Sequence, residues 1–179
     1  MKILVLCGST HKNGTTNSLA DAFISGINRN RHEVETVQIS EKNIAPCLGC
    51  EYCRKNEGEC VRKDDMAQLI PSILEADIIV FVSPIYYFGF NAQLKAVIDR
   101  FYAVNPVLRT QTEKKAILLT AGGGQETWIP DGIFANYHTM LRYLHWTSLG
   151  QVCALGCHVK EQLEKTDCLA EARKLGESL

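Results

Sequence analysis

The chain has 179 residues, about the length of one domain, and hydrophobic residues make up 46% of it while charged residues make up 22%. This composition is that of an ordinary globular domain and excludes a disordered, collagen-like or coiled-coil protein. Lys and Arg number 19 against 20 Asp and Glu, so no basic excess is present to neutralise a polyanion, and nucleic-acid binding is not expected.

Short apolar runs rich in Ile, Val and Leu alternate along the chain with segments of helical periodicity. We expect buried strands over residues 2–7, 32–39, 77–83, 115–121 and 149–155. We expect helices over residues 15–29, 64–75, 90–102, 133–146 and 160–175, and Pro71 should kink or shorten the second of them. This alternation predicts a single α/β domain over residues 1–179, in which helices cover both faces of a parallel sheet.

The apolar run at residues 3–7 is too short for the core of a signal peptide, and no stretch approaches the roughly 20 apolar residues that span a membrane. We therefore expect a cytoplasmic protein with no membrane partner. The chain has eight cysteines, and four of them lie within residues 47–60. In a reducing compartment, such a cluster indicates a metal or redox site. The others are interpreted as buried small hydrophobic residues: Cys7, Cys153, Cys157 and Cys168.

Three loops follow strands at the edge where parallel α/β sheets bind ligands: residues 8–16, 83–90 and 121–130. The first, GSTHKNGTTNS, offers backbone N–H groups and hydroxyls at the start of a helix, which suits a phosphate. It matches neither a Walker A loop nor the G-x-G-x-x-G dinucleotide fingerprint. The alternative is a hydroxyl-rich turn that caps the helix.

The second and third loops could both contact a flat ligand. SPIYYFGF gathers aromatic side chains at an exposed position, which an aromatic ligand explains as well as core or subunit packing does. AGGGQETW begins with three glycines that let the backbone approach a flat ring and offer it N–H donors, although a flexible turn would also use them.

Taken together, GSTHKNGTTNSL, SPIYYFGFNAQLKAVIDR and TAGGG resemble the flavodoxin-like NAD(P)H-dependent FMN reductases, over residues 1 to about 155. The resemblance implies a flavodoxin-like three-layer sandwich with five parallel strands in the order 2-1-3-4-5, FMN as cofactor and NAD(P)H as substrate. It implies no catalytic side chain, because the flavin N5 carries the hydride chemistry, over the open face between residues 86–88 and 122–125.

The same resemblance implies which residues contact FMN. Those near the phosphate would be Ser9, Thr15, Thr16 and Asn17, with His11 where the family usually carries a basic residue. Those near the isoalloxazine ring would be Pro84, Ile85, Tyr86, Tyr87, Phe88, Gly89, Ala121, Gly122, Gly123 and Gly124.

The cysteine-rich loop over residues 44–63 places Cys47, Cys50 and Cys53 at successive C-x-x-C steps, with Cys60 further on. This compact spacing is typical of a [4Fe–4S] cluster and less natural for zinc. Within the family it is similar to the iron–sulfur flavoproteins. Redox-active thiols or packing residues are the alternative. Cys153-x-x-x-Cys157-His158 fits no familiar metal site and is interpreted as core cysteines beside one exposed histidine.

The expected function is an FMN-dependent oxidoreductase that passes a hydride or electrons from NAD(P)H through the flavin to a quinone, another small acceptor or an iron–sulfur centre. The alternative is an iron–sulfur flavoprotein electron carrier that exchanges electrons with ferredoxin-like partners rather than NAD(P)H. A hydrolase or phosphate-binding protein on the same fold is a third class. The resemblance also implies a homodimer or homotetramer.

Overall fold

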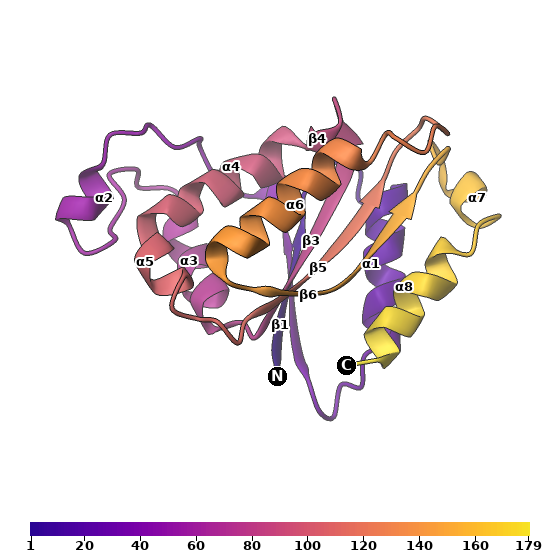
Figure 1. Cartoon of the computed structure of the whole chain (residues 1–179), viewed down its shortest axis with the longest axis horizontal. Coiled ribbons are helices and arrows are strands. Elements are labelled where there is room, and N and C mark those ends of the chain that lie inside the picture. Colours follow the sequence, from indigo (N-terminus) through magenta and orange to yellow (C-terminus); the bar gives the residue numbers. More distant parts are fainter.

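The computed structural model describes all residues from Met1 to Leu179. Its centre is a parallel sheet with the strand order β2-β1-β3-β5-β6 (Figure 1). Counted along the chain, these five strands have the order 2-1-3-4-5 that the family resemblance implies. Their bounds are β1 (Lys2–Cys7), β2 (Glu33–Gln38), β3 (Ile78–Tyr86), β5 (Lys115–Ala121) and β6 (Thr147–Ala154).

Helices cover both faces of the sheet, as expected (Figure 1). The face packed against α1 and α8 and the face packed against α3, α4 and α6 form two separate hydrophobic cores. The helices are α1 (Thr15–Gly26), α2 (Tyr52–Lys55), α3 (Met66–Glu75), α4 (Ala92–Arg100), α5 (Asn105–Leu108), α6 (Asp131–Leu144), α7 (Lys160–Leu163) and α8 (Cys168–Glu177), with 3-10 turns at Ile39–Glu41 and Phe101–Val104.

The two cores are separated by the alternation of side chains along each strand. In β1, Ile3 and Val5 belong to the core under α1 and α8, whereas Leu4 and Leu6 belong to the core under the other three helices. Because both faces are covered, the strand carries apolar residues at consecutive positions. The buried sheet thus holds the ends of its strands, and the loops that follow them, in fixed relative positions.

The structure corrects three predicted elements. The hairpin strand β4 (Gly89–Phe90) pairs antiparallel with β3, so the helix expected from residue 90 begins at Ala92. The helix expected over residues 160–175 is divided into α7 and α8, because the Thr166 hydroxyl donates to the Leu163 carbonyl and accepts from the Cys168 N–H. Pro71 does not end α3, which continues to Glu75 with the proline on its exposed side.

The helices are short compared with a bilayer. None of them combines the length and the apolar character that crossing a membrane would need.

Candidate functional site

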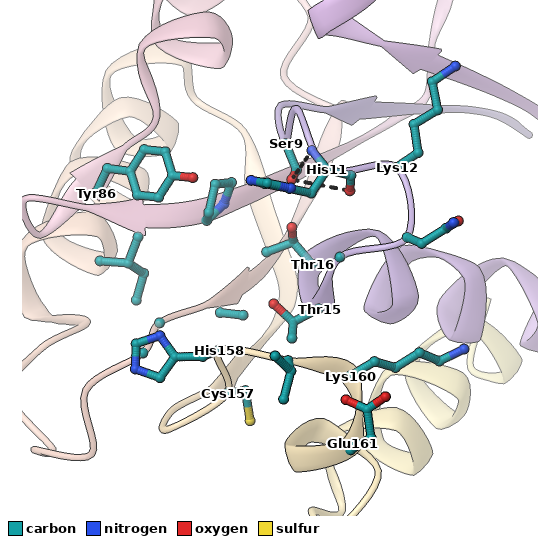
Figure 2. Close-up of a pocket in the computed structure, with 18 residues that line it drawn as sticks. Ser9, His11, Lys12, Thr15, Thr16, Tyr86, Cys157, His158, Lys160 and Glu161 are labelled. Atoms are coloured by element: carbon teal, nitrogen blue, oxygen red, sulfur yellow. Dashed lines mark hydrogen bonds between the residues drawn. The ribbon is translucent and has the colours of Figure 1, made fainter.

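A cleft of about 610 Å³ opens at the carboxyl ends of β1, β3, β5 and β6. This volume lies in the usual range for small-molecule sites. Figure 2 shows Thr15 and Thr16 on one side of the cleft, with Tyr86 and His158 on the opposite side. The lining residues come from four loops: Ser9, His11, Lys12, Asn13, Gly14, Thr15, Thr16, Pro84, Ile85, Tyr86, Ala121, Gly122, Gly123, Cys157, His158, Val159, Lys160 and Glu161.

The N-terminus of α1 forms one wall of the cleft. The residue that precedes it, Gly14, provides no side-chain cap. The backbone N–H groups of Thr15, Thr16 and Asn17 donate to no acceptor of the chain, and the two threonine hydroxyls are also without a partner. Unpaired N–H groups and the positive end of the helix dipole attract an anion. This wall therefore has the character of a phosphate site.

Two of the residues that the resemblance places near the phosphate, Ser9 and Asn17, form hydrogen bonds within the loop before α1. The buried Ser9 hydroxyl lines the cleft but accepts from the His11 N–H at 3.1 Å. Asn17 does not line the cleft: its side-chain amide donates to the carbonyls of His11 (3.3 Å) and Lys12 (3.1 Å). The Asn17 side chain thus supports the loop from inside the protein.

The loop predicted over residues 83–90 is largely a β-hairpin. Tyr87 and Phe88 both have positive φ, at 46° and 64°, as the central residues of a type I′ turn do. Pro84, Ile85 and Tyr86 line the cleft, whereas Tyr87 is fully exposed. Of the predicted ring contacts in this segment, Tyr87, Phe88 and Gly89 therefore lie outside the cleft wall.

Phe88, in the turn of the hairpin, packs against Trp128 and Gly132. The Phe88 ring lies 5.1 Å from the Trp128 ring, centre to centre. A Cβ added to Gly132, at the start of α6, would lie 2.5 Å from the Phe88 carbonyl oxygen. The absence of a side chain at Gly132 is what allows this close approach.

The glycines after β5 have different roles. The Gly122 N–H donates to the Ala154 carbonyl at 2.9 Å, so it continues the sheet and is not free for a ligand. The Gly123 N–H donates to no acceptor of the chain, and Gly123 lines the cleft. Gly124 does not line it and packs on Ile129. Gly123 is thus the residue of this loop with an N–H free to reach a ligand.

The loop after β6 forms a wall of the cleft that was not predicted from the sequence. The Gly156 N–H donates to Gly124 O at 2.7 Å, and the Cys157 N–H donates to Gly122 O at 3.1 Å, so this loop is joined to the glycine loop. The side-chain oxygen of Gln162 accepts from the His158 N–H at 2.7 Å. The rule that ligands bind beyond the carboxyl ends of strands applies to the fifth strand too, and it would have indicated these residues.

Cys157 and His158 were interpreted as a core cysteine and an exposed histidine. Cys157 is buried. Its burial, and to a lesser extent the nearby Cys168 thiol, raises the pKa of the Cys157 thiol. His158 is exposed, but its ring lies against Gly123, where an added Cβ would be 2.1 Å from the ring. Cys153 and Cys168 are only partly buried, so the expectation of core burial holds fully for Cys7 and Cys157.

The buried side chain of Asn91 joins two of the site loops. Its amide nitrogen donates to the Gly8 carbonyl at 2.7 Å, and its backbone N–H donates to the Ser83 hydroxyl at 3.0 Å. A Cβ on Gly8 would lie 2.4 Å from the Asn91 amide oxygen, so glycine is needed there. Asn91 thus fixes the loop after β1 against the end of β3.

The four clustered cysteines line one small pocket of about 20 Å³. Cys47 and Cys50 are exposed, and Cys53 and Cys60 are partly buried. As they are placed, no three His, Cys, Asp or Glu side chains of the chain lie close enough together to hold a metal ion. The cysteine loop therefore has the right donors around one cavity, but it is more open than a closed metal site.

A buried ion pair lies beneath the cysteine loop. Arg100 is 2% exposed and donates to both carboxylate oxygens of Asp64, at 2.7 and 3.0 Å, and to the Ala45 carbonyl at 2.9 Å. Asp64 also accepts from the Ala45 N–H. Burial alone would raise the pKa of Asp64, but the hydrogen bonds from Arg100 and Ala45 outweigh it and hold the pKa below its ordinary value. The pair joins both ends of the loop to α4.

Comparisons with known proteins agree with this geometry. The family model described as NADPH-dependent FMN reductase matches residues 1–152. An iron–sulfur flavoprotein of Archaeoglobus fulgidus is 39% identical over 111 residues, which are 61% of this chain and 50% of that protein. An iron–sulfur flavoprotein of Methanocaldococcus jannaschii is 33% identical over 132 residues, which are 72% of this chain and 68% of that protein. The chain thus spans half to about two thirds of these relatives.

Solved structures share the fold. An NAD(P)H:quinone oxidoreductase from Methanothermobacter marburgensis superposes with a TM-score of 0.75 at 19% identity and covers 99% of this chain and 95% of its own. An azoreductase from Bacillus anthracis superposes with a TM-score of 0.78 at 17% identity, with both chains fully covered. At this identity the likeness establishes the flavodoxin-like fold of the chain.

Proposed function

This chain belongs to the NADPH-dependent FMN reductase family, and we propose that it is an FMN-dependent oxidoreductase. It passes a hydride or electrons from NAD(P)H through the flavin to a quinone, another small acceptor or an iron–sulfur centre. The observation that carries this proposal is the cleft itself. It joins an uncapped helix N-terminus with free hydroxyls to a glycine whose N–H is also free.

The residues of the cleft fit FMN. The N–H groups of Thr15 and Thr16 and their hydroxyls would hold the phosphate, with the His11 side chain beside them. The Gly123 N–H would donate to an oxygen of the isoalloxazine ring. Bound FMN would supply a centre that takes up a hydride and passes electrons to an acceptor.

The protein groups around the ring position act by shape rather than by proton transfer. Tyr86 and His158 lie apart from each other at the end of the cleft away from Thr15 and Thr16 (Figure 2), and Pro84 also lines the cleft, so a flat ring would lie between the Tyr86 and His158 side chains. No paired carboxylates or activated nucleophile line the cleft, and burial keeps the Cys157 thiol protonated. The site is therefore suited to orienting a cofactor that does the chemistry.

A visible spectrum and a reduction assay test the proposal. The full chain, purified without oxygen and incubated with FMN, should retain a yellow chromophore after gel filtration, and NADH or NADPH should bleach it. A chain that retains no FMN would contradict the proposal and favour a hydrolase or phosphate-binding protein. Thr16→Val is expected to lower FMN affinity about tenfold by removing a phosphate hydroxyl, and Thr139→Val, on the exposed face of α6, is the matched control.

We also propose that Cys47, Cys50, Cys53 and Cys60 bind a [4Fe–4S] cluster. The four thiols around one pocket and the iron–sulfur flavoproteins among the relatives support this. The exposed segment with Cys47 and Cys50 would have to close on Cys53 and Cys60, since the thiols are too far apart to hold a metal as placed. Iron and sulfide analysis of anaerobic protein tests it. If the protein contains no iron or sulfide, even after reconstitution, the cluster proposal is contradicted and the four cysteines are free thiols.

The cysteine pocket favours one alternative function, an iron–sulfur flavoprotein carrier that exchanges electrons with ferredoxin-like proteins. A carrier would keep its flavin oxidised in NAD(P)H and be reduced only by a protein donor. The reductase is favoured because the family model describes reductases. The same anaerobic reduction assay distinguishes the two.

A homodimer or homotetramer is the proposed assembly. In Figure 1, α2 of the cysteine loop and α7 at the cleft lie toward opposite ends of the longest axis of the chain. Association of two copies is one way to bring the cluster of one copy near the flavin of another. The exposed Tyr87 and Trp128 beside the cleft are candidate interface residues. Sedimentation velocity measures the assembly.

A further inference from the structure

A second cleft, of about 750 Å³, lies away from the proposed flavin site. It is bounded by the cysteine loop, by α5 and by the C-terminal end of α6, which lie together at one end of the molecule in Figure 1. Its volume exceeds that of the first cleft and also falls in the small-molecule range. It takes no part in the function proposed above.

Two arginines in this cleft are held in place by aromatic rings. The guanidinium of Arg54 lies 4.9 Å from the centre of the Tyr102 ring, and its Nε donates to the Tyr102 hydroxyl. The guanidinium of Arg109 lies 4.9 Å from the centre of the Tyr143 ring. The Asn105 amide donates to the Tyr143 hydroxyl at 2.8 Å. Stacking of this kind orients a guanidinium without neutralising its charge.

Neither arginine forms an ion pair with a carboxylate. The five ion pairs of the chain involve other residues, and Glu57 is the one acidic side chain that lines the cleft. Glu51 lies behind, with its carboxylate 3.3 Å from the Tyr102 hydroxyl. The cleft therefore presents two positive charges that are already oriented and form no ion pair, with Glu57 in the cleft and Glu51 near Arg54 as the carboxylates that oppose them.

The wall between the two arginines is apolar. It is formed by side chains of the 3-10 turn at Phe101–Val104 and of α5, including Val104, Pro106 and Val107, of which Val107 is exposed. A planar ring can lie on such a wall while a carboxylate or sulfonate takes two parallel hydrogen bonds from a guanidinium. We infer that this cleft, here called the arginine cleft, binds a small planar organic anion, such as an aromatic carboxylate or sulfonate.

The arginine cleft also reaches the cysteine loop. Cys53 lines both this cleft and the pocket of the four cysteines. A bound anion would therefore touch the segment that carries the proposed cluster ligands. Binding itself needs neither flavin nor cluster, so it can be measured independently of the proposed function.

Calorimetry with 2-naphthalenesulfonate tests the inference, with the neutral 2-naphthalenemethanol as the matched probe. The full chain is saturated with FMN so that the flavin position of the first cleft is occupied. We expect the sulfonate to bind and the alcohol to bind at least about tenfold more weakly. Arg54→Gln and Arg109→Gln should each weaken sulfonate binding about tenfold or more, and added salt should weaken it further. Arg173→Gln, on α8 and outside the cleft, should change nothing.

Three outcomes would overturn the inference: no sulfonate binding, equal affinity for the two probes, or competition of the sulfonate with FMN. Unchanged affinity in both arginine variants would overturn it as well. A second measurement does not depend on the variants, because amide chemical shifts of the wild-type chain locate the probe. Shifts are expected around residues 102–110 and 143–145, and shifts confined to residues 9–16 would contradict the proposed site.

Discussion

The flavin cleft and the cysteine loop are built in opposite ways. The cleft uses four loops that leave the carboxyl ends of buried strands, and hydrogen bonds of the backbone and of Asn91 link these loops to one another. The cysteine loop is a single long loop with two exposed thiols, and the Arg100–Asp64 ion pair holds its two ends. The cleft is therefore expected to be preorganised, whereas the cysteine loop depends on the ion pair at its base, on the contacts of Arg54 and Glu51 with Tyr102, and on any ligand it binds.

The rate of thiol labelling should differ more between the two regions than any other measured property. Burial raises the pKa of Cys7, the last residue of β1, to about 12, and that of Cys153 also to about 12. Only about one in ten thousand of such thiols is ionised near pH 8. In protein freed of iron, iodoacetamide followed by peptide mass spectrometry should modify the exposed Cys47 and Cys50 orders of magnitude faster. Equal rates would contradict the comparison, and the chain unfolded in urea, where all eight should react alike, is the control.

Removing the carboxylate beneath the cysteine loop should have the largest effect on stability. Asp64→Ala leaves Arg100 buried without its partner, which typically costs about 3–5 kcal/mol. Urea denaturation measures this loss, and limited proteolysis should then cut within residues 44–63 first. Asp99→Asn, which breaks an exposed pair with Lys95, should cost about 0.5 kcal/mol or less. Similar losses in both variants would show that the buried pair does not hold the loop.

Loss of the Asn91 amide tests the linked loops of the cleft. Asn91→Ala leaves the buried Gly8 carbonyl without its donor, which should lower the free energy of unfolding by about 1–3 kcal/mol. FMN affinity should fall with it, because the loop before α1 is no longer fixed. Denaturation and flavin titration measure the two effects, and Asn136→Ala, exposed on α6, should leave both unchanged.

A methyl group at Gly123 tests the contact between two walls. Gly123→Ala would push the His158 ring aside, and since a side chain can move, stability should change little while FMN affinity falls about tenfold. In the double variant with His158→Ala, much of that affinity should return. A double variant no better than Gly123→Ala would mean that the methyl group acts on the flavin position directly. Flavin fluorescence titration measures all three proteins.

The pH dependence of stability gives the smallest signal. The pKa of Asp64 is lower in the folded chain than its ordinary value of 3.8. Its stabilisation is therefore complete above about pH 5 and is lost as the pH falls through the folded pKa. Urea midpoints measured between pH 3 and pH 6 should drop more steeply at the acid end for the wild type than for Asp64→Ala. Parallel curves would contradict this.

The parts of the fold that local pattern determines were predictable. The strands at Lys2–Cys7 and Lys115–Ala121 lie where the apolar runs place them, because a strand buried on both faces needs continuous apolar sequence. The loops after them follow directly. The break before α8 was missed because the hydrogen bonds of Thr166, and not the hydrophobic period, decide it.

Features that depend on tertiary contacts were not predictable. The hairpin places positive φ on Tyr87 and Phe88, against the usual preference for glycine or asparagine, and packing on Gly132 compensates. Asn91 and Arg100 become important only through partners distant in the sequence. The sequence around Arg100 does not show that this buried side chain pairs with the carboxylate of Asp64, 36 residues earlier in the chain.

One rung of the sheet has a further consequence. The Gly122 N–H donates to the Ala154 carbonyl as a strand residue would, and the Cys157 N–H donates to the Gly122 carbonyl. The floor of the cleft is thus joined to the β5–β6 ladder, and its amides should exchange with solvent as slowly as those of the interior strands. Heat or denaturant would then disrupt these backbone hydrogen bonds only when the whole domain unfolds. The site should therefore stay assembled up to the melting point.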